Sequence, residues 1–534
     1  MLQIDHFGIL PARRNGIPNF ATHLSGAAEK SLCIAPTDFF KPFMRPYICS
    51  AFFLSLLGGC ATGPTHDSRL ANTITATNQG DINAAIDQLQ SHTIGALSSD
   101  LLLNLEKGET LRIGSRYKES LSAFEIADRK VSQWEATAKS NPAQLMGHVG
   151  AIFTGDNSRE YEGQDYEKVM LTTRMAMDRV SLGDLDTARV DIKRTHEREA
   201  VIAEFRARET AAAEQEARDK GVRPGARELN GYPVETLNDP EVLKLKNGFQ
   251  NALSHYLSGF VYEALNEPGL AAPGYRKAIE LRPDLPVLEE GLRGLDSRTG
   301  FSRKKGATDV LFIIESGNAP ARRSQKVSFP VPTNKGLITV SLAFPVIFPD
   351  REALSISQLN LGTMTVPTAL VADFNVMARR ALKDELPGMQ LRSAARAVGK
   401  GLLQNQANKQ LGAFGGLIGN MVATATEPDA DDRLWRALPG RVFIARAFVP
   451  PGEYDMRIPG QPDAGKKLAV SGRYMVVPVR MFRNKTYFGE SVQFGEAGTV
   501  ASAPELPKTA APSPAAASLR KIALQPGAAS PGQK

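Results

Sequence analysis

The chain has 534 residues, which is too long for one ordinary domain, so we expect two or three. Hydrophobic residues make up 42% and charged residues 23%, as in globular proteins with a sizeable core. The net charge of +7 fits attraction to anionic lipid or acidic polymers, but it also fits modest basicity without a role. No cysteine follows Cys60 and no histidine follows His255. The carboxyl-terminal half therefore lacks thiolate metal ligands, disulfides and the commonest general base.

Residues 44–60 contain the parts of a bacterial export signal. Arg45 supplies a positive charge, and Ile48 to Leu57 are apolar over a stretch too short for a membrane-spanning helix of roughly 20 residues. The stretch ends in the pattern of a lipobox, in which two small residues admit the signal peptidase and the cysteine thiolate receives the lipid. The alternative is a buried apolar helix that happens to end in cysteine. The four lipobox residues are Leu57, Gly58, Gly59 and Cys60.

The resemblance to lipoprotein precursors implies palmitate-type acyl chains on Cys60. Each buried CH₂ contributes about 0.8 kcal/mol, so several chains together make release from the membrane negligible. Residues 61–70 then form a tether, and alanine rather than aspartate at Ala61 favours the outer membrane, facing the periplasm, over the inner membrane. Residues 1–43 are interpreted as an over-extended amino terminus, because Met44 stands where the initiator is expected.

Residues 70–300 have the spacing of helical repeats, and the clearest unit lies between Ala252 and Asp284. Small residues would let two helices approach, aromatic residues would fill the space between them, and a proline would end the second helix. The tryptophan-type and leucine positions of a tetratricopeptide repeat instead hold His255 and Ser258. The matching residues are Gly259, Tyr262, Ala271, Tyr275, Ala278 and Pro283.

Weaker units upstream keep parts of the same pattern. Gly108 and Phe124 repeat the offset of the clearest unit, and a turn at Gly183 separates two further helical segments. Stacked units bury a continuous core and line a groove that suits extended peptides, although a purely structural spacer is the alternative. A helix over 194–220 carries mixed charges, which predicts a solvated face and gives no support for nucleic-acid binding.

Residues 305–500 change to strand periodicity, and we expect a small β-sandwich-like domain. A helical insertion is predicted over 371–425; its glycine-rich part is either a hairpin packed on the sheet or a contact with membrane or partner. The Ala/Pro-rich residues 501–534 are expected to be disordered. The fold class is thus α+β, with a tetratricopeptide-like array first. Strands are predicted at 309–315, 338–346, 441–448, 474–482 and 487–494.

Motifs of catalysis are missing from the sequence. It has no phosphate loop, no Gly-x-Ser-x-Gly elbow and no His-Glu-x-x-His pair. The acidic run 429–432 could suggest a hard-cation site, but nothing completes a calcium loop, so we favour a helix cap before Leu434 and Trp435. We therefore predict no catalytic residue, no metal site and no cofactor.

The architecture resembles an uncharacterised family of proteobacterial lipoproteins with tetratricopeptide-like helices and a strand-rich carboxyl-terminal domain. The resemblance covers most of residues 57–460 and implies a cell-envelope location, near cell-wall synthesis factors, without implying a substrate. It rests on the lipobox, Tyr161-Glu162, Tyr166-Glu167-Lys168-Val169, Gly183-Asp184 with Ala188-Arg189, Trp435-x-x-Leu438-Pro439, and Pro451-Gly452-Glu453-Tyr454.

Three functions remain open from the sequence. The leading hypothesis is a membrane-anchored periplasmic scaffold that binds an envelope protein through the repeat groove. The alternative is a module for a cell-wall or surface polysaccharide, which exposed aromatic residues on the sheet would favour and a buried Trp435 would disfavour. A hydrolase would need a cleft with paired carboxylates, and the sequence offers no sign of one.

Overall fold

The computed structural model describes residues 66–92, 95–145, 160–219, 232–299, 306–333, 336–350, 353–389, 430–461 and 465–495. All of these belong to one compact unit, residues 64–534. The lipobox, the tether up to residue 65, the predicted glycine-rich run of the insertion and the tail lie outside the described residues.

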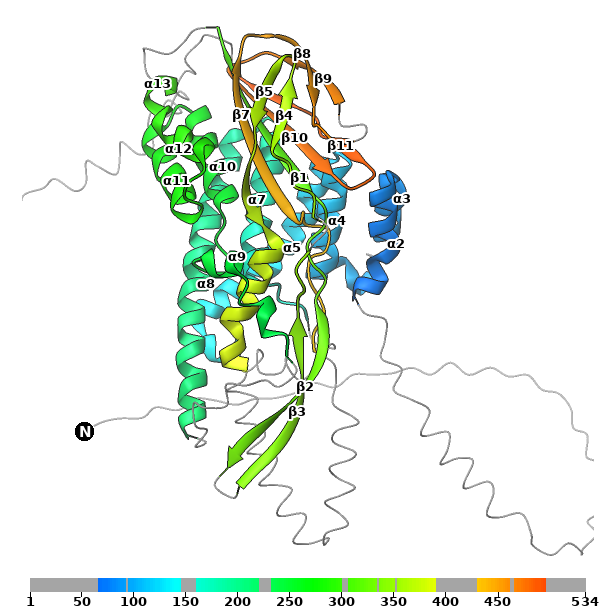
Figure 1. Ribbon diagram of the computed structural model, residues 1–534, viewed down its shortest axis with the longest axis vertical. Coiled ribbons are helices and arrows are strands. Elements are labelled where there is room, and N and C mark those ends of the chain that lie inside the picture. The colour runs from blue at the N-terminus through cyan, green and yellow to red at the C-terminus, as the bar shows by residue number, and fades with distance from the viewer. Residues whose placement is uncertain are drawn as a thin grey trace, which may run out of the picture. The chain divides into compact units, whose positions relative to one another are not determined.

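The amino-terminal part is built from helices that pack in successive pairs (Figure 1). Short turns join the members of each pair, as in αα-hairpins. α2 (His66–Gln79) pairs with α3 (Ile82–His92), α4 (Leu101–Ile113) with α5 (Tyr117–Ser140), α7 (Asp165–Ser181) with α8 (Leu185–Asp219), and α10 (Ala252–Ala264) with α11 (Pro268–Leu281). Shorter helices are η1 (Gly95–Ser99), η2 (Val234–Thr236), α9 (Pro240–Lys244), α12 (Pro286–Arg293) and α13 (Leu295–Thr299).

Each of the four turns contains one residue with positive φ, which reverses the chain within a few residues. These residues are Gly80, Ser115, Gly183 and Asn266. Glycine adopts this conformation without steric cost and asparagine tolerates it, whereas Ser115 is an unusual choice. The sequence predicted the turn at Gly183, and the structure confirms it.

Two helix pairs approach closely at a glycine that faces an aromatic ring sixteen residues later. A methyl group on Gly259 would come within 2.6 Å of the Tyr275 ring, and one on Gly108 would collide with the Phe124 ring. Both rings are fully buried. The α4/α5 and α10/α11 pairs therefore share one packing solution, as the repeat spacing predicted.

The carboxyl-terminal part contains three sheets (Figure 1). A six-stranded sheet has the order β11-β10-β1-β7-β6, with β12 also on β10; β1 and β10 are parallel and the other pairs antiparallel. Its strands are β1 (Thr308–Ser316), β6 (Ala369–Asp373), β7 (Arg441–Val449), β10 (Tyr474–Met481), β11 (Thr486–Phe488) and β12 (Val492–Phe494). A four-stranded sheet, β5-β4-β8-β9, comprises β4 (Gln358–Leu361), β5 (Met364–Pro367), β8 (Gly452–Arg457) and β9 (Gly465–Val470), and β2 (Arg323–Thr333) pairs with β3 (Gly336–Val346).

Strand β1 lies in the centre and is buried on both faces. Val310, Phe312 and Ile314 pack with residues of the four-stranded sheet, which gives the predicted sandwich-like core. Leu311 and Ile313 point the other way and share a core with the helices. The molecule therefore has three layers within its described part: helices, the six-stranded sheet and the four-stranded sheet.

Most strand predictions are confirmed, with differences in detail. The 487–494 segment forms two short strands, β11 and β12, in place of one. Residues 369–373 form β6 and the helix begins at 374, so the predicted insertion starts later than residue 371. Residues 452–454, interpreted as part of a turn, open β8. No helix among the described residues is long and apolar enough to cross a membrane.

Candidate functional site: the interface between helices and sheet

The first helices of three successive pairs, α4, α7 and α10, face the six-stranded sheet. Phe260 of α10 meets Tyr474 of β10 edge-on, with ring centroids 5.7 Å apart. These helices would line the groove that the repeats predicted as a partner site. In the described part of the chain that face is instead covered by strands of the same chain and by residues 434–438. The interface therefore brings together side chains that are far apart in sequence.

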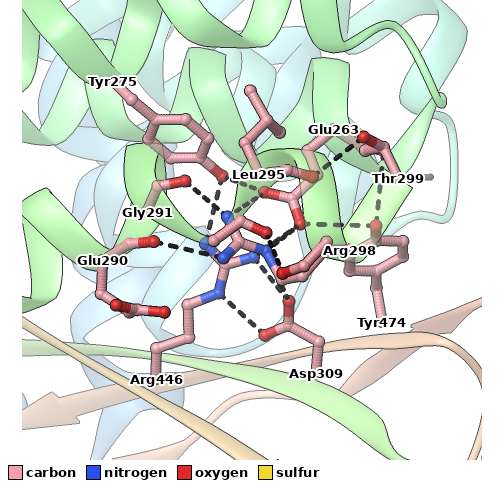
Figure 2. A network of polar contacts seen from close by, with 12 residues as sticks. Glu263, Tyr275, Glu290, Gly291, Leu295, Arg298, Thr299, Asp309, Arg446 and Tyr474 are labelled. Atoms are coloured by element: carbon pink, nitrogen blue, oxygen red, sulfur yellow. Dashed lines mark hydrogen bonds and ion pairs between the residues drawn. The ribbon is translucent and has the colours of Figure 1, made fainter. Parts of the chain in front are cut away.

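The first polar cluster joins α10 and α13 to the sheet (Figure 2). Arg446 of β7 donates from Nε to Asp309 Oδ1 at 2.8 Å and from Nη2 to Glu263 Oε1 at 2.9 Å. Arg298 donates from Nε to Glu263 Oε1 at 2.6 Å. Two guanidinium groups thus face two carboxylates in a region where the Glu263 side chain is 0% exposed and that of Arg446 3%.

Charge balance and burial act in opposite directions on these carboxyl groups. Burial alone would raise the pKa of Glu263, but Arg446 and Arg298 outweigh it and lower that pKa. For Asp309, burial dominates and raises the pKa despite Arg446. Burial also raises the pKa of Tyr275 well above its ordinary value, so its hydroxyl keeps its proton and donates to Glu263 Oε2 at 2.7 Å. The cluster is consequently a fixed set of donors and acceptors.

A second cluster links α4 and α7 to the far end of β1. Arg174 forms ion pairs with Glu109, at 3.1 Å, and with Glu315. Arg480 of β10 lies 3.4 Å from Glu109 and 3.8 Å from Glu315. Burial raises the pKa of Glu109 and lowers that of Arg480 to about 10, which is still high enough to keep the guanidinium charged at neutral pH. Each end of β1 is therefore attached to the helices by buried ion pairs.

Residues 434–438 are held in the helix face by two glutamates. Glu106 of α4 accepts the backbone N–H groups of Arg436 at 2.6 Å and Ala437 at 2.8 Å, and Glu167 of α7 accepts that of Trp435 at 2.7 Å. The Trp435 ring is fully buried and contacts Phe124 edge-on at 5.7 Å. This burial counts against the polysaccharide module that an exposed Trp435 would have supported.

Helix α2 begins at His66, so the prediction of a tether up to residue 70 is wrong for residues 66–70. The helix is attached to the same segment, residues 434–438. Asp432 accepts the backbone N–H of His66 at 3.1 Å, so a residue 366 positions later in the sequence caps the first turn of α2. Arg436 pairs with Asp67 at 2.6 Å. The prediction that the acidic run caps a helix at Leu434 and Trp435 is wrong, because those residues lie in no helix and Asp431 pairs with Arg433. In the described part of the chain, no cluster of three or more His, Cys, Asp or Glu side chains could hold a metal ion.

Helix α8 departs from the predicted solvated face. Arg198 is 1% exposed, and it pairs with Asp128 at 3.0 Å and with Glu135 of α5. Glu199 is buried and accepts from His255 Nε2 at 3.2 Å. Glu204 and Arg208 remain exposed and pair with each other, as predicted. The prediction is wrong for the part of α8 that packs on α5 and α10, because a long helix between two neighbours has little free surface.

His196 and His255 stack between α8 and α10 with ring centroids 4.9 Å apart and an interplanar angle of 11°. Burial lowers the pKa of His196 below 6.5, and the neighbouring His255 lowers it further. The unfolded chain therefore takes up this proton at a higher pH than the folded chain, so His196 reduces stability as the pH falls below 6.5.

We expect His196→Gln to flatten the dependence of the unfolding free energy on pH just below 6.5, without changing it above that range. Urea unfolding at a series of pH values from about 7.5 to about 5 measures the slope. An unchanged slope in the variant would show that His196 binds protons equally in both states.

The structure places the repeat residues within α10 and α11 or just after them. Ala271, Tyr275 and Ala278 are fully buried, Tyr262 is partly buried, and Pro283 follows the end of α11 at Leu281.

The sequence analysis did not predict the charged residues of the two clusters as a site. A signal existed, because Asp309 and Glu315 bracket an apolar run, and a charge there needs a partner once buried. The sequence offered no means of naming that partner.

Comparisons with known proteins add little to this geometry. No family model matches the chain, and no curated protein matches it. The crystal structure of a tetratricopeptide repeat protein from Parabacteroides merdae ATCC 43184, at 2.39 Å resolution, is similar over 43% of this chain and 98% of its own, with 13% identity and a TM-score of 0.13. At that TM-score the helix pairing rests on the contacts within this chain alone.

Proposed function

We propose that the protein is a non-enzymatic interaction scaffold, anchored by lipid on Cys60 to the outer membrane and facing the periplasm, where it serves cell-envelope assembly. The observation that carries the proposal is the stack of helix pairs, an architecture that presents long surfaces to partner proteins. The lipobox Leu57–Cys60 supports the anchor.

The inner helix face is occupied by the chain's own sheet, so the proposed partner binds the outer helices. Arg189 of α8 donates to Glu267 at 2.9 Å, which brings α8 beside the start of α11. Close to this contact, Val190 is 50% exposed and Leu270 is 55% exposed. Contiguous exposed apolar patches mark protein-binding surfaces, and in this proposal Val190 and Leu270 belong to one such patch.

Photo-crosslinking in intact envelopes tests this surface. A photoreactive residue at Val190 or Leu270 should capture one and the same protein. The same residue at Leu243 of α9 is the matched control, because Leu243 is equally apolar and 51% exposed but lies on another helix. Capture that is equal from all three positions, or absent from Val190 and Leu270, would contradict the proposed surface.

The anchor is tested separately. We expect the wild-type chain to incorporate an alkyne-labelled palmitate in bacterial cells and to fractionate with the outer membrane. Cys60→Ala should lose the label and leave the membrane fraction, while folding normally, because Cys60 lies outside the compact unit 64–534. Equal labelling of both proteins would reject Cys60 as the lipid attachment site.

A further inference from the structure

The β2/β3 hairpin extends away from the helices and from the other two sheets (Figure 1). Its two strands have eleven residues each and pair along their whole length. Among the described helices and strands, each of the two packs extensively only on the other. A two-stranded hairpin is marginally stable in water by itself, so the outer half of this arm would gain stability from a surface that covers it.

The pairing register divides the hairpin into an apolar face and a face of mainly small or polar residues and prolines. The second face includes Ser328, which is paired with Ser341. On the first face, apolar residues stand opposite each other in three successive cross-strand pairs. These pairs are Val327 with Leu342, Phe329 with Val340, and Val331 with Ile338.

At the base of the hairpin the apolar face packs on the rest of the protein. Val327 and Phe344 are buried and belong to the core that the sheet shares with the helices. The Phe344 ring meets Tyr232 edge-on, with centroids 6.3 Å apart, and the Tyr232 hydroxyl donates to the Pro345 carbonyl at 3.0 Å. The base is therefore fixed to the fold, and the same two strands carry the apolar face outward from it.

The free edge of β2 is unsuited to pairing with another strand. Pro330 and Pro332 have no N–H group, and prolines occur in strands where the missing donor faces away from the paired strand. A second copy or a peptide could therefore not add a regular strand along this edge. The open edges also exclude a position across the hydrocarbon of a membrane, where unpaired backbone groups are not tolerated. A partner must therefore contact the apolar face.

The charge of the hairpin indicates the chemistry of this partner. Between Glu315 and Asp350 the sequence has basic residues and no acidic one. Two of the basic residues, Arg323 and Lys326, are exposed. The hairpins of two copies would repel each other, whereas an anionic lipid surface attracts basic residues and also accepts apolar ones. The full set of basic residues is Arg322, Arg323, Lys326 and Lys335.

A second stretch of similar composition enters the fold at the base of the hairpin. Ala430 donates its backbone N–H to Ser324 Oγ of β2 at 2.8 Å. The preceding residues 390–429 lie outside the described part of the chain. Their sequence includes the apolar glycine-rich run 411–425, several basic residues and no acidic residue before Glu427. The apolar and basic composition of the hairpin is thus repeated in the residues that enter beside it.

We propose that the outer half of the β2/β3 hairpin binds the surface of an anionic phospholipid membrane. Its apolar face enters the headgroup region and its basic residues lie near the lipid phosphates, without crossing the bilayer. This arm is a second membrane attachment beside the proposed lipid on Cys60, and it does not depend on that lipid. Failure of the arm and failure of the anchor are therefore separate results.

Tryptophan fluorescence tests the two faces directly, because bromine atoms in lipid acyl chains quench only tryptophans that enter the membrane. The native Trp134 and Trp435 are buried in the fold and give a constant background. In the purified full chain with Cys60→Ala, which carries no lipid, brominated phosphatidylglycerol vesicles should quench Phe329→Trp strongly. Ser341→Trp, on the polar face, should be quenched much less. The apolar signal sequence can attach both proteins to vesicles, so the readout is the excess quenching at position 329.

This excess should fall sharply at high salt and when phosphatidylcholine replaces phosphatidylglycerol, because charge attracts the arm to the lipid. Adding Val340→Asn, opposite position 329, should remove most of the excess. Ser341→Asn places the same side chain on the polar face and should keep the excess, so it controls for effects on folding. Equal quenching at both positions, no quenching at position 329, or an excess that phosphatidylcholine reproduces would overturn the proposal. A lipid-free dimer that Val340→Asn dissociates would also overturn it, because the face would then bind a second copy.

Discussion

Replacing Arg446 by methionine should cost about 3–5 kcal/mol in unfolding free energy at neutral pH, because it leaves two buried carboxylates with too little positive charge. Methionine keeps most of the apolar stem, so the loss comes from the charge. Glu263 and Asp309 would then share Arg298 alone, which lies 2.6 Å from the first and 3.9 Å from the second. Guanidinium denaturation of the full chain measures the change.

The variant should lose less stability in acid. Removal of Arg446 raises the pKa of the two carboxyl groups, which then protonate within the folded protein at a higher pH than in the wild type. Since the folded variant then takes up more protons, its deficit relative to wild type should shrink as the pH falls from 7 toward about 5. A deficit that is constant with pH would indicate lost packing instead of uncompensated charge.

Arg441→Met is the matched control on the same strand. Arg441 also forms an ion pair, with Asp373 at 2.8 Å, but its side chain is 26% exposed, and the buried Asp373 carboxylate keeps the Val376 N–H as a second donor. A partly solvated pair contributes about 0–1 kcal/mol, so its loss should be small. Adding Asp309→Asn to Arg446→Met should recover much of the stability, because Glu263 and Arg298 then remain as one balanced pair. Equal effects of Arg446→Met and Arg441→Met would contradict the role of burial.

The contrast between these two arginines shows where prediction from the sequence ends. Period-two alternation predicted the strand that carries Arg446, and the glycine-to-aromatic offset predicted the α10/α11 pair. Both signals are local. Arg446 meets Asp309 across 137 positions and Glu263 across 183, and Arg480 meets Glu109 across 371. Such pairings depend on strand order and on which helix face meets the sheet, and neither follows from spacing within a segment.

The short strands of the four-stranded sheet escaped prediction for another physical reason. β4 and β5 have four residues each, and most of the residues of β5 are exposed. Half-exposed strands of this length bury too few side chains to show alternation. Their contribution is clear only in three dimensions, where Leu359, Leu361 and Val366 cover one face of β1.

The second large effect is expected at Trp435, a residue that the sequence analysis placed at the start of a helix. Trp435→Ala should cost about 3–5 kcal/mol in unfolding free energy, because it removes the largest fully buried side chain and leaves a cavity beside Phe124. The same change should release residues 434–438 from the two glutamates, so that Glu167 Oε1 and Glu106 Oε2 each lose a backbone donor.

Trp435→Phe is the variant that separates packing from hydrogen bonding. The indole Nε1 of Trp435 is buried without a partner, so phenylalanine removes an unsatisfied donor while it keeps an aromatic ring against Phe124. Its cost should therefore be well below that of alanine, at most about 2 kcal/mol. If phenylalanine is as damaging as alanine, the indole N–H has a bound partner that matters.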